Sequence, residues 1–282
     1  MKKRRLTQKT ESTTALSQFE EYLEKFTPEL RPYMRRIHLG EAIPNATKMV
    51  RYEERVFAFF DILGWSQLIR DSLSKPTALR RLAGVQLWMN LDHQLHKDKE
   101  SYDGKYMTHF SDSIALSWPR NEWPKNIEET KGSLNRIIFD LAETVWNLFL
   151  NRFLTRGGLV AGKIFHRPEI VFGPALVDAY NLESKIAIYP RIVIHERLFS
   201  EIDSPLVRRD FDGMPFLDFL ALGRTADWFP KFLKQVRRFI LKEYETHRGN
   251  PTVQTKYGWL ITYFNSQLTY FNSGSVTPIT LD

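Results

Sequence analysis

The sequence contains no cysteine among its 282 residues. This absence excludes a disulfide-stapled secreted scaffold, a thiolate nucleophile and a Cys-ligated zinc site, and we expect a cytoplasmic protein. Glycine and proline are sparse, at 14 each, which excludes collagen-like and linker-like chains. No apolar run approaches the roughly 20 residues that a membrane-crossing helix needs, so we expect no membrane span.

Aromatic residues are abundant instead, with 20 Phe, 11 Tyr and 7 Trp, and 43% of the chain is hydrophobic. That composition predicts a folded chain with a sizeable core rather than a disordered one. The net charge is +7, but Lys2–Arg5 carry four of the positive charges in what we interpret as a basic tail. Basic pairs elsewhere are scattered among acidic and apolar residues, so we expect no nucleic-acid partner.

The hydrophobic pattern predicts an α+β fold, with a mainly antiparallel sheet in βααββαββαβ order flanked by helices. We expect a polar basic tail and helical arm over 1–50, a catalytic domain over 51–225 and a C-terminal helical extension over 226–282. The expected strands lie near 55–60, 105–110, 113–118, 155–165, 170–172, 191–194 and 208–211, and the expected helices near 65–73, 77–100, 127–151, 174–186, 228–247 and 252–271.

Two aspartates stand at positions that could carry chemistry. Asp61 ends a buried aromatic strand, and Asp112 lies at a hairpin tip 51 residues later. If the two strands are neighbours, both carboxylates project at one sheet edge, where magnesium or manganese could bind them and the backbone carbonyl of Ile62. Taken alone, aspartates at such places are more often simple turn formers.

Four segments around these aspartates resemble, in sequence order, the motifs of class III nucleotidyl cyclases. Residues 59–66 (FFDILGWS) resemble the first-strand signature F-x-D-I-x-G-F-[ST], and 110–113 (FSDS) the metal-binding hairpin. Residues 156–162 (RGGLVAG) resemble the R-x-G-[IL]-x-x-G strand. Residues 172–174 and 179–183 resemble the family's G-x-x-V-N-x-A-x-R-[ML]-E helix.

The resemblance implies a class III cyclase-like fold and a homodimer with both active sites at its interface. It also implies a nucleoside triphosphate substrate and two Mn²⁺ or Mg²⁺ ions per site, held by Asp61, Ile62 and Asp112. In our hypothesis one ion activates the ribose 3′ hydroxyl and the other bridges the triphosphate. Arg156 is a candidate for stabilising the transition-state charge.

The departures from the family pattern concern the base and the transition state. Thr108 and Ile170 replace the residues with which purine cyclases read the base, which argues against an adenylate or guanylate cyclase of the usual kind. Val177 and Asn181 occupy the positions of the family's transition-state Asn and Arg. If the motif is aligned four residues later, Asn181 and Lys185 occupy the positions of the transition-state Asn and the basic residue that follows it (Asn-x-x-x-basic).

A narrower resemblance, over 171–177, 189–194 and 256–265, is to the Pycsar pyrimidine cyclases of bacterial antiphage defence. It implies that UTP, or less favourably CTP, is converted to a cyclic nucleotide that a separate effector protein reads. Phe60 is then expected to lie against the nucleotide, and the Thr108 hydroxyl to contact the pyrimidine edge.

Two other functions remain open at this point. A catalytically degenerate cyclase fold could serve as a nucleotide-binding or scaffolding module, which the altered position at Asn181 favours. Nucleic-acid binding through the basic tail would show a steep dependence of affinity on salt.

Overall fold

The computed structural model describes residues 19–24, 28, 31–41, 50–97, 104–120, 127–167, 170–270 and 276–281. The basic tail at Lys2–Arg5 and the first part of the expected helical arm lie outside these residues. The chain divides into two compact units, 1–51 and 52–282. The described part of the first unit contains one helical turn over 19–23 and helix α2 (Arg31–His38).

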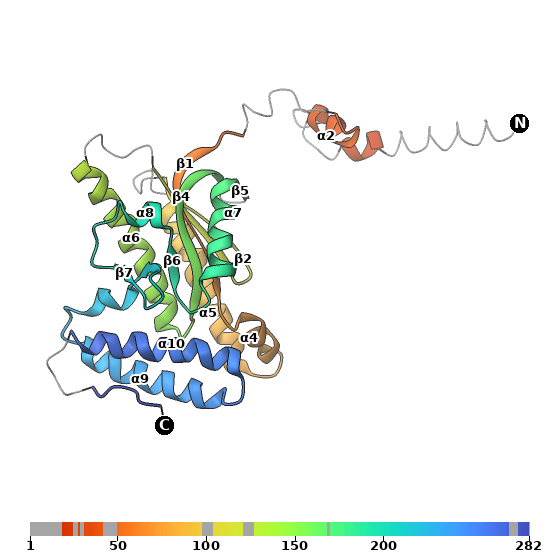
Figure 1. Ribbon diagram of the computed structural model, residues 1–282. Helices are drawn as coiled ribbons and strands as arrows, with labels where there is room; N and C mark the ends of the chain where they lie inside the picture. Colours follow the sequence, from red (N-terminus) through yellow and green to blue (C-terminus); the bar gives the residue numbers. More distant parts are fainter. Residues whose placement is uncertain are drawn as a thin grey trace, which may run out of the picture. The chain divides into compact units, whose positions relative to one another are not determined.

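A single mixed sheet forms the centre of the second unit (Figure 1). Its order is β2-β3-β1-β4-β6-β8-β7, and β5 pairs with β4 beside this path. Every described pairing is antiparallel except that of β4 with β6. The predicted α+β class with a mainly antiparallel sheet is thereby confirmed. The strands are β1 (Glu53–Ile62), β2 (Tyr106–Phe110), β3 (Ser113–Pro119), β4 (Thr155–Arg167), β5 (Ile170–Phe172), β6 (Ile192–Ile194), β7 (Val207–Arg209) and β8 (Pro215–Leu217).

Helices cover both faces of this sheet. The element order follows the predicted alternation, with the hairpin β2–β3 and helices between the longer strands. The predicted helix over 174–186 is α7 followed by a π-helical turn, η1. The helical elements are α4 (Trp65–Ser72), α5 (Pro76–Lys97), α6 (Ile127–Leu150), α7 (Pro174–Asn181), η1 (Leu182–Ile186), α8 (Glu196–Phe199), η2 (Phe219–Gly223), α9 (Phe229–Thr246) and α10 (Pro251–Leu268).

The sheet separates two apolar clusters because successive strand residues point to opposite faces. On one face, Phe60 and its alternate neighbours in β1 pack with α5, α6, α9 and α10 in the larger core. On the other face, Phe57 and Val160 pack with Ala175 and Ala179 of α7. Helices α9 and α10 lie side by side and belong to the same unit as the sheet (Figure 1).

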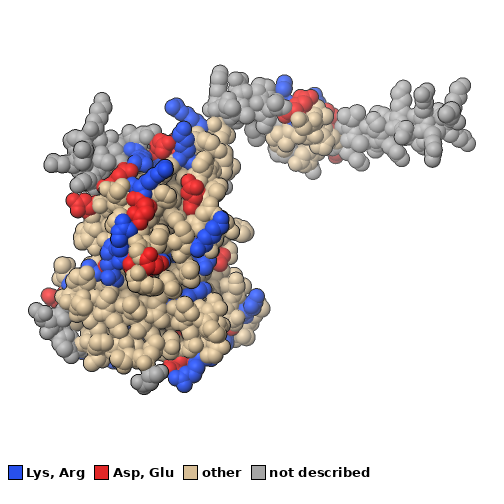
Figure 2. All heavy atoms as spheres, viewed as in Figure 1, with Lys and Arg blue, Asp and Glu red and all other residues tan. Residues whose placement is uncertain are grey.

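Charged side chains are unevenly spread over the second unit. Figure 2 shows Lys, Arg, Asp and Glu over the sheet and its connections, and few of them over the face that α10 presents in this view. The sequence of α10 explains this, because Lys256 is its single charged residue. Among the described helices, none combines the length and the hydropathy of a bilayer-crossing segment.

Candidate functional site

The end of β1 and the tip of the β2–β3 hairpin lie together at one edge of the sheet. Asp61 is the Cα partner of Ser113 in β3, and the Ile62 N–H donates to the Asp112 carbonyl oxygen at 2.9 Å. The Ser113 hydroxyl donates to Asp61 Oδ1 at 2.6 Å. Both aspartates are half-buried. The structure therefore brings the two candidate metal ligands to adjacent positions and fixes the orientation of one carboxylate.

The hairpin has an unusual backbone conformation at its tip. Phe110 and Ser113 pair across a two-residue turn, and Ser111 has a φ of 58°. A positive φ at the first central residue is the mark of a type II′ hairpin turn, where glycine is the favoured residue. The turn therefore places Ser111, directly before Asp112, in the left-handed region.

Arg156 lies across β1 from the hairpin. It is the Cα partner of Asp61 in β4, so both side chains share a sheet face. Its guanidinium forms an ion pair with Glu183 in η1, whose side chain is 3% exposed. Burial raises the pKa of Glu183, an effect that Arg156 opposes and the nearby Asp61 reinforces. The edge thus holds alternating charges in the order Asp61, Arg156, Glu183.

Glu183 is the site residue that the sequence reasoning did not select. It appeared only as the last residue of the motif over 179–183. Its signal was a glutamate directly after an apolar helix position, one turn beyond α7. The role of Glu183 becomes visible only when β4 places Arg156 next to it.

Two glycines of β4 permit this arrangement. A Cβ on Gly158 would meet the Cβ of Leu182 at 2.6 Å and the Ala179 carbonyl oxygen at 2.7 Å. A Cβ on Gly157 would meet the Phe59 carbonyl oxygen at 2.4 Å. These distances are too short for any real side chain, so Gly157 leaves room for β1, and glycine at 158 is required for α7 and η1 to approach the strand. That approach brings Glu183 to Arg156.

Phe60 does not belong to this edge. Its side chain is fully buried, and it points to the face of the sheet opposite Asp61, into the larger core. Neighbouring residues of a strand alternate between faces, so one residue of this pair must be turned away from the site. The expected contact of Phe60 with a nucleotide therefore has no support in the structure. Phe59 lies on the face of Asp61, half-buried, with its ring 6.2 Å from that of Tyr180.

Thr108 lies on the same face as Asp61, farther along the hairpin. It pairs with Ala115, which in turn pairs with Phe59. Its hydroxyl lies 3.0 Å from His166 Nε2 and donates to the Arg167 carbonyl oxygen at 3.3 Å.

His166 connects Thr108 to a buried polar network. His166 Nδ1 lies 2.8 Å from the Ser117 hydroxyl, which accepts a hydrogen bond of 2.8 Å from Arg55 Nε. Burial and the charges of Arg55 and Arg167 lower the pKa of His166 to about 3. A neutral imidazole with both nitrogens bonded holds Thr108 in a fixed position.

Asn181 and Lys185 flank Glu183 at the end of α7 and in η1. Asn181 is half-buried and Lys185 is exposed. No hydrogen bond or ion pair between described residues joins either of them to Asp61 or Arg156. Val177, which occupies the position of the family's transition-state Asn in the first register, is exposed on α7. The structure thus brings together Asp61, Ile62, Asp112 and Arg156.

The donors at the edge suit a hard divalent cation. They are two carboxylates and a backbone carbonyl, all oxygen atoms. Within the described ranges, no group of three or more His, Cys, Asp or Glu side chains could hold a metal alone. Magnesium sites commonly use one or two protein carboxylates together with substrate phosphates.

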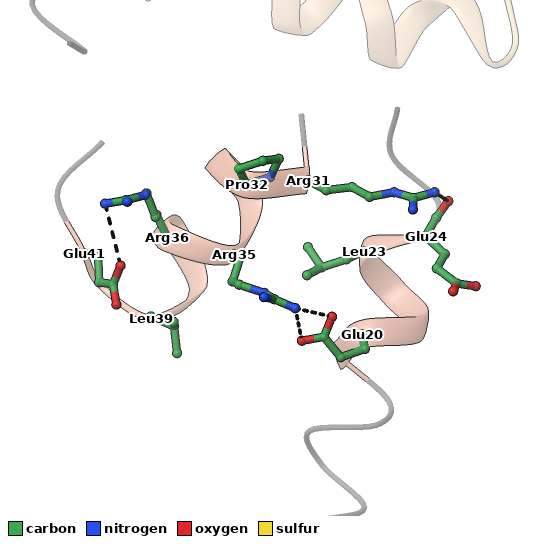
Figure 3. A pocket seen from close by; sticks show the side chains of 9 residues that line it. All are labelled: Glu20, Leu23, Glu24, Arg31, Pro32, Arg35, Arg36, Leu39 and Glu41. Carbon is green, nitrogen blue, oxygen red and sulfur yellow. Dashed lines mark hydrogen bonds and ion pairs between the residues drawn. The ribbon is translucent and has the colours of Figure 1, made fainter. Parts of the chain in front are cut away.

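Two cavities lie outside this edge. One, of about 580 Å³, belongs to the first unit, where Glu20 pairs with Arg35 and Arg36 lies 3.8 Å from Glu41 (Figure 3). Its charged lining residues are thus largely paired with each other. The other, of about 1000 Å³, lies between α4, the segment before β4, and helices α9 and α10.

Comparisons with known proteins give similarities of fold only. No protein-family model matches the chain, and no curated protein matches it. Among solved structures, the adenylyl cyclase CyaB from P. aeruginosa is 15% identical with a TM-score of 0.39, over 60% of this chain and 94% of that one. A bacterial light-regulated adenylyl cyclase is 15% identical with a TM-score of 0.39, over 74% and 64% of the two chains. The guanylyl cyclase Cya2 is 12% identical with a TM-score of 0.33, over 60% and 91%.

Proposed function

We propose that this chain is a nucleotidyl cyclase that converts a pyrimidine nucleoside triphosphate, UTP rather than CTP, to its 3′,5′-cyclic nucleotide and pyrophosphate. The observation that carries the proposal is the meeting of Asp61 and Asp112 at one sheet edge, through the 2.9 Å bond from the Ile62 N–H to the Asp112 carbonyl. Neither aspartate is used as a helix cap or buried ion-pair partner among the described residues, so both carboxylates can serve a ligand.

Asp61, Asp112 and the Ile62 carbonyl would hold Mn²⁺ or Mg²⁺ in this proposal. When bound, such ions neutralise a triphosphate and lower the pKa of an attacking hydroxyl. Neighbouring residues of the chain position and orient the groups that would bind the ions and the triphosphate. The Ser113 hydroxyl fixes Asp61 Oδ1 at 2.6 Å, and Glu183 fixes the guanidinium of Arg156 on the same face. Arg156 then provides positive charge where the triphosphate would lie, without reorganising during the reaction.

The reaction itself needs no covalent protein intermediate. The ribose 3′ oxygen attacks the α-phosphorus while the bond from that phosphorus to the bridging oxygen breaks, so that pyrophosphate leaves and the hydroxyl proton passes to water. Catalysis of this kind depends on positioning and on charge neutralisation.

The preference for a pyrimidine rests on Thr108. In place of the charged residues of purine cyclases, the face of Asp61 offers a neutral hydroxyl that His166 and Arg167 hold in place. The hydroxyl of Thr108 can form a hydrogen bond with one position of a pyrimidine ring. Recognition of a purine would need a second polar residue, and Ile170 stands at that position. We propose further that the product is a second messenger of antiphage defence, read by a separate effector.

A homodimer would complete this site. Arg156 is already paired with Glu183, and in this proposal a second copy supplies further transition-state charge. Phe110 at the hairpin tip is 84% exposed, and Val177 and Tyr180 on α7 are 58% and 53% exposed, on or beside the face of Asp61. Apolar side chains exposed together in this way favour a protein interface.

The test is to incubate the purified chain with each of the four ribonucleoside triphosphates and Mn²⁺ and to identify products by mass spectrometry. We expect cyclic UMP from UTP, a smaller amount of cyclic CMP, and little product from ATP or GTP. Cyclic AMP or cyclic GMP as the main product would contradict the pyrimidine preference but not the cyclase activity.

A nucleotide-binding or scaffolding module without catalysis is the second candidate. The presence of Val177 and Asn181 at the positions of the family's transition-state Asn and Arg favours it, because those transition-state residues are then missing. This candidate predicts that UTP binds and is recovered unchanged at every divalent metal tested.

A further inference from the structure

A cleft of about 1000 Å³ in the second unit gathers positive charge without an assigned role. Helix α4, the start of α5, the segment before β4 and helices α9 and α10 form its walls. Two acidic residues, Asp71 and Glu243, also line it. Asp71 is already engaged with Lys75 at 3.0 Å. The lysines and arginines that line the cleft are Arg81, Arg152, Arg238, Lys242 and Lys256.

These five cations form no close ion pair among the described residues, although the carboxylate of Glu243 in the same cleft stabilises the charge of Arg81. No ion pair within 4.0 Å involves any of them in the part of the chain that the structure describes. Arg81 Nη2 donates instead to the Arg152 carbonyl oxygen at 3.1 Å. Cations that are concentrated in a concave surface repel one another, and this repulsion is relieved by a bound anion.

Aromatic rings hold two of the guanidinium groups in the cleft. The Arg81 guanidinium lies 4.9 Å from the ring centroid of Phe153, and that of Arg152 lies 4.8 Å from the ring of Phe239. Such contacts orient a guanidinium plane and leave its N–H groups pointing away from the ring. Two arginines are therefore preorganised to donate to a ligand in the cleft.

Burial acts on the cations as well. Burial lowers the pKa of Arg81, and the carboxylate of Glu243 opposes this effect. Burial also lowers the pKa of Lys256, and the charge of Arg156 adds to the effect. Lys256 is the single charged residue of α10, whose visible face is nearly free of charge in Figure 2. The one charge of that helix thus lies where desolvation disfavours it and where an anion would stabilise it.

We infer that this cleft binds a small ligand that carries several phosphate groups. The cavity has the size of pockets that enclose small molecules. Arginine binds phosphate oxygens in a bidentate manner, and lysine adds a point charge. The cleft includes Leu63 and Gly64 but neither Asp61 nor Asp112, so it adjoins the carboxylate edge without containing its two aspartates. The inference does not depend on the proposed cyclase activity.

Two kinds of small ligand carry several phosphate groups, namely nucleoside polyphosphates and inorganic polyphosphate. Isothermal titration calorimetry of the full chain with ATP and with inorganic tripolyphosphate distinguishes them. The titrations are done in EDTA, which removes the cations that the carboxylate edge would need. We expect both probes to bind; tighter binding of ATP indicates a nucleotide, and equal or tighter binding of tripolyphosphate indicates the inorganic ion.

The test variant is Arg238→Gln with Lys242→Gln, two exposed residues one turn apart on α9. The matched control is Lys231→Gln with Lys234→Gln, which removes the same charge from α9 outside the cleft. We expect the test variant to bind tripolyphosphate at least about tenfold more weakly, since it loses two charge-assisted contacts, and the control to bind as the parent does.

An Asp61→Asn variant separates the two sites. We expect it to bind tripolyphosphate in EDTA as the parent does, because Asp61 lies outside the cleft. Equal weakening in the α9 test and control variants would overturn the inference, as would no binding by the parent. Binding of a short DNA oligonucleotide through Arg238 and Lys242, with neither small probe bound, would also overturn it.

Discussion

Ser111 has a strained backbone conformation in the turn that precedes Asp112. Its φ of 58° lies in a region that is unfavourable for residues with a Cβ. We predict that Ser111→Gly raises the free energy of unfolding by about 0.5 kcal/mol, the relief of strain exceeding the extra entropy of glycine in the unfolded chain.

Urea unfolding measures this effect. The matched control is Ser72→Gly at the end of α4, a helical position where glycine should destabilise by about 0.5–1 kcal/mol. Equal losses of stability in both variants would show that the turn at Ser111 tolerates serine without strain.

His166 makes stability depend on pH. Its pKa is lowered to about 3 in the folded chain, against about 6.5 when unfolded. Above pH 6.5 the imidazole is neutral in both states and contributes nothing. As the pH falls from about 6.5 to about 3, the unfolded chain binds a proton that the folded chain does not, so stability falls by up to about 1.4 kcal/mol per pH unit.

We therefore predict that His166→Gln reduces the loss of unfolding free energy between pH 7.5 and pH 5, measured by urea unfolding at each pH. His195→Gln, at the half-buried N-cap of α8, is the control for the removal of a histidine. An unchanged pH dependence in His166→Gln would contradict the account of a neutral buried imidazole.

At this scale the sequence indicated that two aspartates would be adjacent, but it did not indicate which charged residues pair beside them. Asp61 and Asp112 could be selected because turn positions with motif flanks are visible in the sequence. Phe60 could have been rejected, because it adjoins Asp61 in a strand and must face the other way. The pairing of Glu183 with Arg156 could not be predicted, because it joins residues on different elements.

At the scale of elements, Gly158 of β4 decides how closely α7 and η1 approach the sheet. We predict that Gly158→Ala lowers the free energy of unfolding by several kcal/mol, because its Cβ would meet Leu182 at 2.6 Å and the Ala179 carbonyl at 2.7 Å. Displacement of η1 should also separate Glu183 from Arg156.

Gly258→Ala is the matched control for this variant. Gly258 lies inside α10 with open space around it, so alanine there should stabilise by about 0.5–1 kcal/mol. Thermal unfolding of both variants measures the difference. A Gly158→Ala variant as stable as the parent would show that α7 does not need this close approach.

The longer elements and the short strands β5, β6 and β7 were predictable from the sequence, and the other short elements were not. The β1 strand, the hairpin and helices α6, α9 and α10 have strong apolar patterns, and each was predicted near its observed bounds. Strand β8 has three residues and is defined by its pairing with β6 and β7, which the local sequence does not encode. The π-helical turn η1 continues the spacing of α7 closely enough to be read as one helix.

At the scale of the whole molecule, the exposed apolar residues favour self-association. We predict a dimer in sedimentation equilibrium and a monomer for the double variant Phe110→Glu with Val177→Glu, which places charge on the proposed interface. Leu73→Glu is the control, because Leu73 is 89% exposed on another part of the unit. A parental monomer, or a double variant that remains dimeric, would contradict this interface.

The central claim is that two aspartates at one sheet edge hold the cations of a cyclase. The most direct measurement is the yield of cyclic UMP from UTP and Mn²⁺ by the parent, Asp61→Asn, Asp112→Asn and the control Asp227→Asn, each verified as folded by circular dichroism. Asp227 is exposed and remote from the hairpin in sequence. We predict product from the parent and the control only, and none from the parent in EDTA. Undiminished product from Asp61→Asn or Asp112→Asn, or no cyclic nucleotide from the parent, would contradict the account.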